Sequence, residues 1–249
     1  MIVLKTKDEI SLMKQAGQIA AGALQAAGET VKPGVSTCEI NRACESFIRK
    51  HGAYPTFKGY LGFPAAACIS INDEVIHGIP NKSRIVKEGD IVSIDCGATF
   101  KGYVGDNAAT FAAGNITPEA QRLCDATREC LYEGIKMAQA GGRLGDIGST
   151  IQRYVESRGF SVVKDFTGHG IGKQMHEDPS VPNYGTPGRG TKLQQGMVLA
   201  IEPMVLSGQN KLRTLPDGWL VKTKDGSLAA HFEHTVAITS NGPVILTRI

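Results

Sequence analysis

Apolar residues recur at helical spacing in two segments near the start of the chain. The first follows Thr6-Lys7-Asp8-Glu9, a capping box whose threonine and glutamate can bind the free backbone amides of a helix start. Its apolar face consists of Ile10, Met13, Ile19, Ala20, Ala23, Leu24 and Ala27. A second capping box, Ser36-Thr37-Cys38-Glu39, opens a helix that ends at Lys50-His51-Gly52. Two successive helices without a strand between them predict a helical layer on one face of a sheet.

Short apolar runs bounded by turn residues predict strands. One covers residues 67–71, and another covers residues 91–95 and ends in the carboxylate of Asp95. After a reversal, a further strand begins with Asp106. A two-residue turn centred on Phe100-Lys101 places Asp95 directly opposite Asp106, with Cβ atoms ~4.5–5.5 Å apart. Carboxylates this close repel each other unless a cation or a proton lies between them, although taken alone both could be solvated charges at strand ends.

The second half of the chain repeats this plan. A helix is predicted from Thr117-Pro118 to about residue 139, and another over residues 146–158. When the chain is compared with itself, a shift of 107 residues aligns two helices and a strand, and it pairs Asp95 with Glu202. This regularity indicates an internal duplication.

The duplication extends to the second strand of each hairpin. Asp106 pairs with Glu233 if about twenty residues, near 206–229, are inserted in the second hairpin. The sequence therefore predicts a single domain over residues 1–249, with pseudo-twofold related halves of roughly 1–115 and 116–249.

Four carboxylates occupy matching positions in the two predicted hairpins: Asp95, Asp106, Glu202 and Glu233. If the halves pack about a pseudo-twofold axis, these side chains converge on one central point. Four negative charges without a basic neighbour are untenable in a buried cleft unless cations are present. Oxygen-rich ligand sets suit Mn, Mg, Co or Fe better than thiolate-bound zinc.

Composition narrows the function classes. The chain has 249 residues, 41% of them apolar, and a net charge of +3 without a long basic run, so no specific nucleic-acid partner is expected. The N-terminus does not resemble a signal peptide and no segment is suited to span a membrane, so we expect a cytoplasmic protein. The six cysteines form no Cys-x-x-Cys pair, which argues against a structural zinc module.

Three histidines lie in distinctive surroundings. His169 is flanked by glycines in Gly168-His169-Gly170-Ile171-Gly172, a pattern too short for a dinucleotide-binding fingerprint. The duplication gives His169 no partner, since the shift places Gly62 there. His77 and His176, taken alone, could equally be a core or turn histidine and a surface histidine.

Together these motifs resemble the type I methionine aminopeptidases of bacteria, in peptidase family M24. The resemblance rests on the glycine-flanked His169, His176-Glu177, Ile201-Glu202-Pro203, Phe232-Glu233-His234-Thr235 and the spacing of the two aspartates, in order along nearly the whole chain. It implies an α+β "pita-bread" fold, a duplicated structure in which helices cover a curved antiparallel sheet and metals lie at its centre.

The resemblance also implies roles for individual residues. Asp106 and Glu233 would bridge two divalent cations (Co2+, Mn2+, Fe2+ or Zn2+), Asp95 would complete one metal site, and His169 and Glu202 the other. His77 and His176 match two substrate-contacting histidines. The methionine pocket would draw on Phe57, Tyr60, Phe63, Cys68, Met175 and Trp219. Phe57, Phe63 and Met175 replace the cysteine, tyrosine and phenylalanine of better-known bacterial members, and these changes keep the pocket apolar.

The implied function is removal of the N-terminal methionine from nascent proteins when the second residue is small. Hydroxide activated between the two metals would attack the first peptide bond. Glu202 would act as general base and proton shuttle, His77 would bind the departing nitrogen, and His176 would stabilise the oxyanion. The implied partners are N-terminal peptides and, transiently, the ribosome, and the protein is expected to be a monomer.

Two alternatives remain open on the sequence. A proline-directed exopeptidase of this fold, such as a prolidase or aminopeptidase P, usually carries an additional N-terminal domain, for which Asp95 comes too early. A non-catalytic ribosome- or RNA-binding protein of this fold would have lost metal ligands, whereas all five are present here. Assays of Met-Gly-Met and of an X-Pro peptide, each with and without chelator, distinguish a methionine aminopeptidase from these two alternatives.

Overall fold

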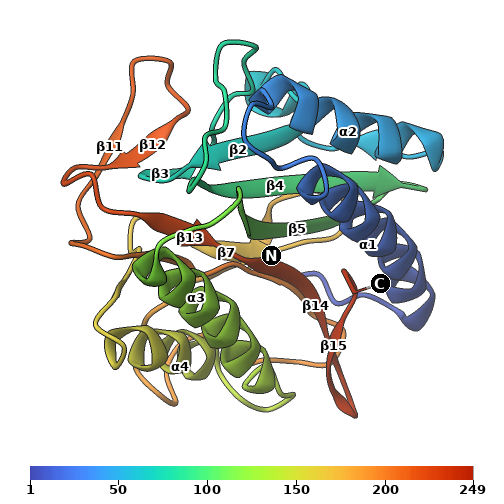
Figure 1. The fold of residues 1–249 in the computed structure, drawn as a ribbon. Coiled ribbons are helices and arrows are strands. Elements are labelled where there is room, and N and C mark those ends of the chain that lie inside the picture. The colour runs from blue at the N-terminus through green and yellow to red at the C-terminus, as the bar shows by residue number, and fades with distance from the viewer. Residues whose placement is uncertain (249) are drawn as a thin grey trace.

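The computed structural model describes residues 1–248, in which four α-helices surround a curved antiparallel sheet (Figure 1). The helices are α1 (Lys7–Gly28), α2 (Thr37–Lys50), α3 (Pro118–Lys136) and α4 (Leu144–Glu156). Thr6 and Ser36 form the two predicted capping boxes. Helix α4 begins two residues before its predicted start because the carboxylate of Asp146 accepts a hydrogen bond from the backbone N–H of Arg143, at 2.8 Å.

The helices form one pair for each half of the chain. Helix α1 contacts the sheet strands of the first hairpin and α2 packs beside α1, whereas α3 and α4 pack against each other over the second half (Figure 1). The predicted helical layer on the sheet is thus confirmed for both halves. No helix within the described part of the chain combines the length and the apolar character needed to cross a membrane.

The main sheet has nine strands, and every pairing in it is antiparallel. Its order is β1-β4-β5-β14-β9-β7-β8, with β2 also paired to β4 and β15 to β14. These strands are β1 (Tyr54–Pro55), β2 (Ala67–Ile71), β4 (Ile91–Phe100), β5 (Tyr103–Ala112), β7 (Gly168–Gly170), β8 (Glu177–Val181), β9 (Val198–Ile201), β14 (Glu233–Thr239) and β15 (Gly242–Ile245).

Two small sheets and one short helix complete the described elements. One sheet has the order β13-β10-β6 and the other β11-β12-β3. Their strands are β3 (Glu74–Ile76), β6 (Ser161–Val162), β10 (Met204–Leu206), β11 (Leu212–Thr214), β12 (Val221–Thr223) and β13 (Ala229–His231), and the 3-10 helix η1 covers Tyr60–Gly62. The predicted insertion near residues 206–229 contains β11 and β12, and β12 pairs with β3 of the first half.

The duplication is visible in the strand order. Strands β5 and β14, which carry Asp106 and Glu233, are neighbours at the centre, and the equivalent strands β4 and β9 flank them. The seam between β5 and β14 is short, with Ala108 opposite Glu233 and Asn107 opposite His234. Beside these pairs, the Thr235 hydroxyl accepts a hydrogen bond from the Asp106 N–H at 3.0 Å and donates one to the Asp106 carbonyl at 2.8 Å.

The predicted register of the first hairpin is wrong by two residues. Asp95 lies opposite Ala108, and Asp106 lies opposite Gly97, so the two aspartates are diagonal neighbours. The turn residues are Lys101 and Gly102, both with positive φ (50° and 79°), as a tight hairpin turn requires. Because a shift of two residues preserves the side-chain alternation, Asp95 and Asp106 still point to the same face of the sheet.

Helix α1 approaches the sheet unusually closely next to the ligand strand β5. A Cβ atom on Gly105 would lie 2.4 Å from the backbone nitrogen of Gly17, and one on Gly17 would lie 2.6 Å from the carbonyl oxygen of Leu246. Only glycine leaves room for backbone contacts this close. The glycine pair therefore fixes α1 directly against the residue that precedes Asp106.

Candidate metal centre

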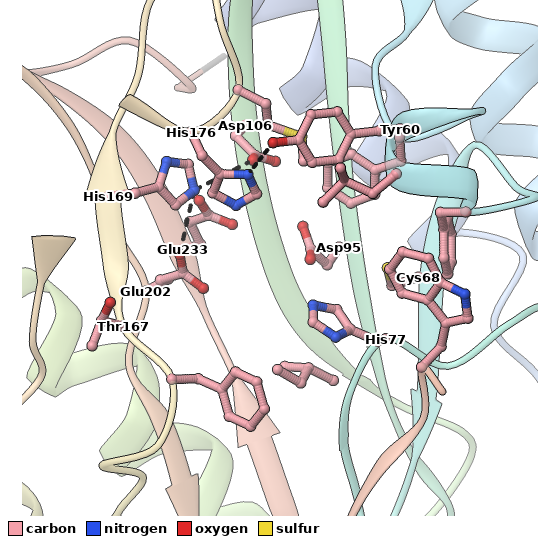
Figure 2. Close-up of a pocket in the computed structure, with 17 residues that line it drawn as sticks. Tyr60, Cys68, His77, Asp95, Asp106, Thr167, His169, His176, Glu202 and Glu233 are labelled. Carbon is pink, nitrogen blue, oxygen red and sulfur yellow. Dashed lines mark hydrogen bonds and ion pairs between the residues drawn. The ribbon is translucent and has the colours of Figure 1, made fainter. Parts of the chain in front are cut away.

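Five neighbouring strands each bring one predicted ligand to the centre of the sheet. In spatial order they are β4, β5, β14, β9 and β7. Their ligands, in the same order, are Asp95, Asp106, Glu233, Glu202 and His169, with Glu202 directly following the last residue of β9. Figure 2 shows the carboxylate and imidazole groups pointing into one cavity.

The ligand atoms lie within reach of a shared cation. The Nε2 atom of His169 lies 3.5 Å from Oε1 of Glu202 and 4.0 Å from Oδ2 of Asp106. Asp106, His169 and Glu233 each offer one atom such that all three lie within 4.8 Å of one another. Oδ1 of Asp95, Oδ1 of Asp106 and Oε1 of Glu233 are buried and have no hydrogen-bond partner in residues 1–248. Buried acceptors without partners are costly, and a cation is the natural partner for them.

The charges of this cluster are mutually unfavourable without a cation. Burial, followed by repulsion from Glu202, raises the pKa of Asp106 to about 8, and burial raises the pKa of Glu202 to about 8. Burial, followed by repulsion from the other carboxylates, raises the pKa values of Asp95 and Glu233 well above their usual range. Among the described residues, no Lys or Arg lines the cavity.

His169 is held in the form that binds metals. Burial lowers its pKa to about 4, so the imidazole is neutral at physiological pH. Its Nδ1 atom lies 2.9 Å from the carbonyl oxygen of Gly170, which leaves Nε2 as the free ligand atom facing the carboxylates. One imidazole and four carboxylates form a donor set that fits divalent first-row cations.

All thirteen site residues predicted from the sequence line a single cavity of about 200 Å³. Its apolar wall includes Phe63 and Trp219, whose rings meet edge to face with centroids 5.1 Å apart. Phe57, Cys68 and Met175 are also buried in this wall. The insertion thus delivers Trp219 to a pocket that also contains Phe57, Tyr60 and Phe63 of the first half.

His176 and His77 flank the carboxylates from opposite sides (Figure 2). The Nδ1 atom of His176 lies 2.8 Å from the hydroxyl of Tyr60, and its ring centroid lies 4.2 Å from that of His169. His77 has a φ of 62°, an uncommon backbone conformation for a non-glycine residue, and its ring lies edge-on to Phe166 and Trp219. Burial, followed by the nearby His231 and His176, lowers the pKa of His77 to about 4, and burial lowers the pKa of His176.

The sequence interpretation missed several residues at this site. Leu61, Ile76, Phe166 and Thr167 also line the cavity. His231 is 2% exposed, its Nε2 atom lies 3.5 Å from Oε2 of Glu202, and burial lowers its pKa to about 3. Its position two residues before Glu233 was the available signal, because strand alternation places residues two apart on one face.

Comparison with known proteins agrees with this geometry. The sequence profile of metallopeptidase family M24 matches residues 11–240. The chain belongs to this family. It is 57% identical over 247 residues to the methionine aminopeptidase of Clostridium acetobutylicum, with 99% of both chains covered. It is 50% identical to methionine aminopeptidase 1 of Bacillus subtilis, with both chains covered completely. The predicted resemblance to bacterial methionine aminopeptidases is confirmed.

Solved structures of the family have the same fold. The methionine aminopeptidase of Thermotoga maritima superposes with a TM-score of 0.98 at 47% identity, and the match covers 100% of each chain. The prolidase of Pyrococcus furiosus gives a TM-score of 0.79 at 24% identity, and the match covers 99% of this chain and 66% of that one. The prediction of a duplicated pita-bread fold is therefore confirmed. At 24% identity, the similarity to the prolidase supports the fold and not the activity.

Proposed function

We propose that this metallopeptidase removes the N-terminal methionine from nascent proteins whose second residue is small. The proposal rests on one observation: five potential metal ligands and an apolar wall line the same cavity. High identity over the full length to methionine aminopeptidases supports it further. Residues 1–249 would act as one catalytic domain.

The proposed metal site holds two divalent cations, drawn from Co2+, Mn2+, Fe2+ and Zn2+. Asp106 and Glu233 would bridge them, because both lie on the central strands and each has a buried oxygen without a partner. Asp95 would complete the site on the β4 side, and His169 and Glu202 would complete the site on the β7 side. When bound, the cations supply Lewis acidity and make water nucleophilic at neutral pH.

The residues of the chain would bind the peptide and move its protons. The carboxylate of Glu202 accepts the proton of the attacking water and transfers it to the departing amine. His77, on the opposite side of the cavity, donates a hydrogen bond toward the departing nitrogen. His176 donates from Nε2 to the oxyanion, which is possible when its Nδ1 accepts the hydrogen bond of the Tyr60 hydroxyl.

The pocket is suited to an unbranched thioether side chain. Phe57, Phe63, Cys68, Met175 and Trp219 present carbon, sulfur and aromatic surface. Aromatic rings make favourable contacts with a methionine sulfur, and the flexible side chain adapts to an irregular wall. A cavity of about 200 Å³ has room for one such side chain.

The substrates implied by this function are N-terminal peptides of nascent proteins in the cytoplasm. The proposal therefore includes transient association with the ribosome. We expect the enzyme to work as a monomer, since every residue proposed for catalysis comes from one chain.

Hydrolysis of Met-Gly-Met by the metal-reconstituted protein tests the proposal. We expect cleavage that a chelator abolishes and that Mn2+, Fe2+ or Co2+ restores, and we expect E233Q to be inactive. An X-Pro peptide is the comparison substrate. Cleavage of X-Pro without cleavage of Met-Gly-Met would assign a proline-directed exopeptidase. Inactivity on both peptides with all three metals would assign a binding protein.

A further inference from the structure

His231 occupies a fixed position directly behind the ligand set. It is the last residue of β13, where it pairs with Met204 of β10, two residues after Glu202. Its backbone N–H donates to the hydroxyl oxygen of Thr110 at 2.9 Å, and its carbonyl accepts from the same hydroxyl at 3.0 Å. This double contact with β5 holds the backbone of His231 against the strand that carries Asp106.

The side chain of His231 faces one oxygen of Glu202. Its Nε2 atom lies 3.5 Å from Oε2 of Glu202 and has no hydrogen-bond partner among the described residues. The other oxygen of the same carboxylate, Oε1, lies 3.5 Å from Nε2 of His169. The Glu202 carboxylate is thus flanked by an imidazole nitrogen at each oxygen.

The two imidazoles are placed for different tasks. His169 lies close to Asp106 and Glu233, which are proposed to bridge the cations. The Nε2 atom of His169 therefore faces the cation side of the cavity, as does Oε1 of Glu202 beside it. Oε2 of Glu202 points to His231 and away from His169. A buried imidazole N–H without an acceptor is destabilising, and Oε2 of Glu202 is the acceptor within reach.

We propose that His231 is a positioning residue that donates its Nε2–H to Oε2 of Glu202. The hydrogen bond fixes the rotation of the carboxylate, so that Oε1 stays directed at the cation side. This inference rests on the proposed metal site. It adds a residue that neither the ligand set nor the substrate contacts include. Loss of such an outer hydrogen bond to a metal ligand typically weakens metal binding 10–100-fold.

A direct metal-ligand role is the competing assignment, since Glu202, His231 and Glu233 each offer an atom within 4.8 Å of the others. Glutamine distinguishes the two roles. Its amide N–H can replace the donor, but the amide is a poor substitute for imidazole as a ligand. Leucine and alanine remove the donor altogether, and leucine retains most of the buried volume.

The test is calorimetric titration of the metal-free full chain with Co2+, together with the visible absorption spectrum of the Co2+ form. We expect H231L and H231A to weaken one of two binding steps about 10–100-fold. We expect H231Q to bind within about threefold of the unaltered protein and to keep its Co2+ spectrum, because no nitrogen ligand is lost. Far-UV circular dichroism identifies which variants are folded. The Co2+ affinity of H231Q is then compared with that of H231L or H231A, and one folded variant of these two is sufficient.

His234 provides a matched control. It is half-buried next to Glu233, but its Nδ1 lies 2.9 Å from the Thr247 hydroxyl and its Nε2 3.2 Å from the Tyr132 hydroxyl, both away from the cavity. We expect H234Q to leave Co2+ affinity unchanged. Weak binding by H231Q together with an altered Co2+ spectrum would overturn the proposal in favour of a ligand role. Unchanged affinity in H231L would overturn it in favour of simple packing. Peptide hydrolysis by the unaltered protein is measured separately. A failure of the proposed peptidase function can therefore be distinguished from a failure of the role proposed for His231.

Discussion

The hydroxyl of Tyr60 lies 2.8 Å from Nδ1 of His176, and the direction of this hydrogen bond is tied to the tautomer of the imidazole (Figure 2). When the hydroxyl donates to Nδ1, the ring proton must reside on Nε2. Only this tautomer can donate a hydrogen bond from Nε2 to an oxyanion in the cavity.

Tyr60→Phe should therefore lower kcat on Met-Gly-Met about 3–10-fold, the value of one hydrogen bond, with a smaller change in KM. The phenyl ring retains the apolar contacts of the pocket, which is why KM is less affected. The ¹⁵N chemical shifts of His176 report the tautomer directly. An unchanged tautomer in the variant would contradict this role of Tyr60.

His77→Ala should bind metal normally but lose about 10²-fold in kcat. The side chain lies on the pocket side of the carboxylates, between Phe166 and Trp219, and is not among the groups that can share a cation with them. Titration with Co2+ and steady-state kinetics on the same preparation separate the two effects. A weakened Co2+ affinity would show that His77 supports the metal site instead of the peptide.

The metal-free protein should lose stability as pH rises from about 7 to about 8, a range in which histidines are neutral in the folded and the unfolded chain. Asp106 and Glu202 ionise near pH 4 in the unfolded chain but have pKa values of about 8 in the folded protein. The folded state therefore holds more protons in this window, and each such group lowers the free energy of unfolding by up to about 1.4 kcal/mol per pH unit. The buried histidines, whose pKa values burial lowers, act in the opposite direction below about pH 6.5, so the loss of stability emerges above that pH.

Urea unfolding of the chelated protein between pH 7 and pH 8 measures this slope. E202Q should show a shallower slope, because its amide does not titrate. Added Co2+ should remove most of the dependence, since bound cations favour the ionised carboxylates. A flat profile for the metal-free protein would contradict the charge repulsion inferred for the cluster.

Gly105→Ala should destabilise the protein by about 1–3 kcal/mol, because its methyl group would overlap the backbone of Gly17. Helix α1 would have to move away from β5, and Asp106 is the next residue of that strand. We therefore expect weaker Co2+ binding as well as a lower melting temperature. A variant that melts lower yet binds Co2+ normally would show that β5 keeps its position without α1.

Local patterns predicted most of the fold and the ligand positions. The capping residues Thr6 and Ser36 marked helix starts correctly, and the repeat of Asp95 at Glu202 revealed the symmetric halves. The predicted hairpin register was wrong because Lys101 adopts a left-handed conformation, which a lysine in the sequence does not indicate. Glycine at 102 was the one local indication of the true turn.

Features that depend on distant contacts could not be predicted. The pairing of β12 with β3 joins segments far apart in the chain, and no residue pattern in the insertion specifies its partner. His231 lies in a short strand, and its relation to Glu202 arises only when β10 and β13 pair. Its position two residues before Glu233 indicates the same side of the chain, but it does not indicate the contact with Glu202.

The short seam between β5 and β14 gives the metals a mechanical role. Two opposed residue pairs and the Thr235 hydroxyl join the central strands, whereas β4 and β5 are paired along ten positions. Cations shared by Asp106 and Glu233 would link β5 to β14 and stabilise the contact between the two halves. Removal of the cations would then favour local opening between β5 and β14. Amide hydrogen exchange would become faster in these two strands first, while the exchange rates of the outer strands of the sheet would not change.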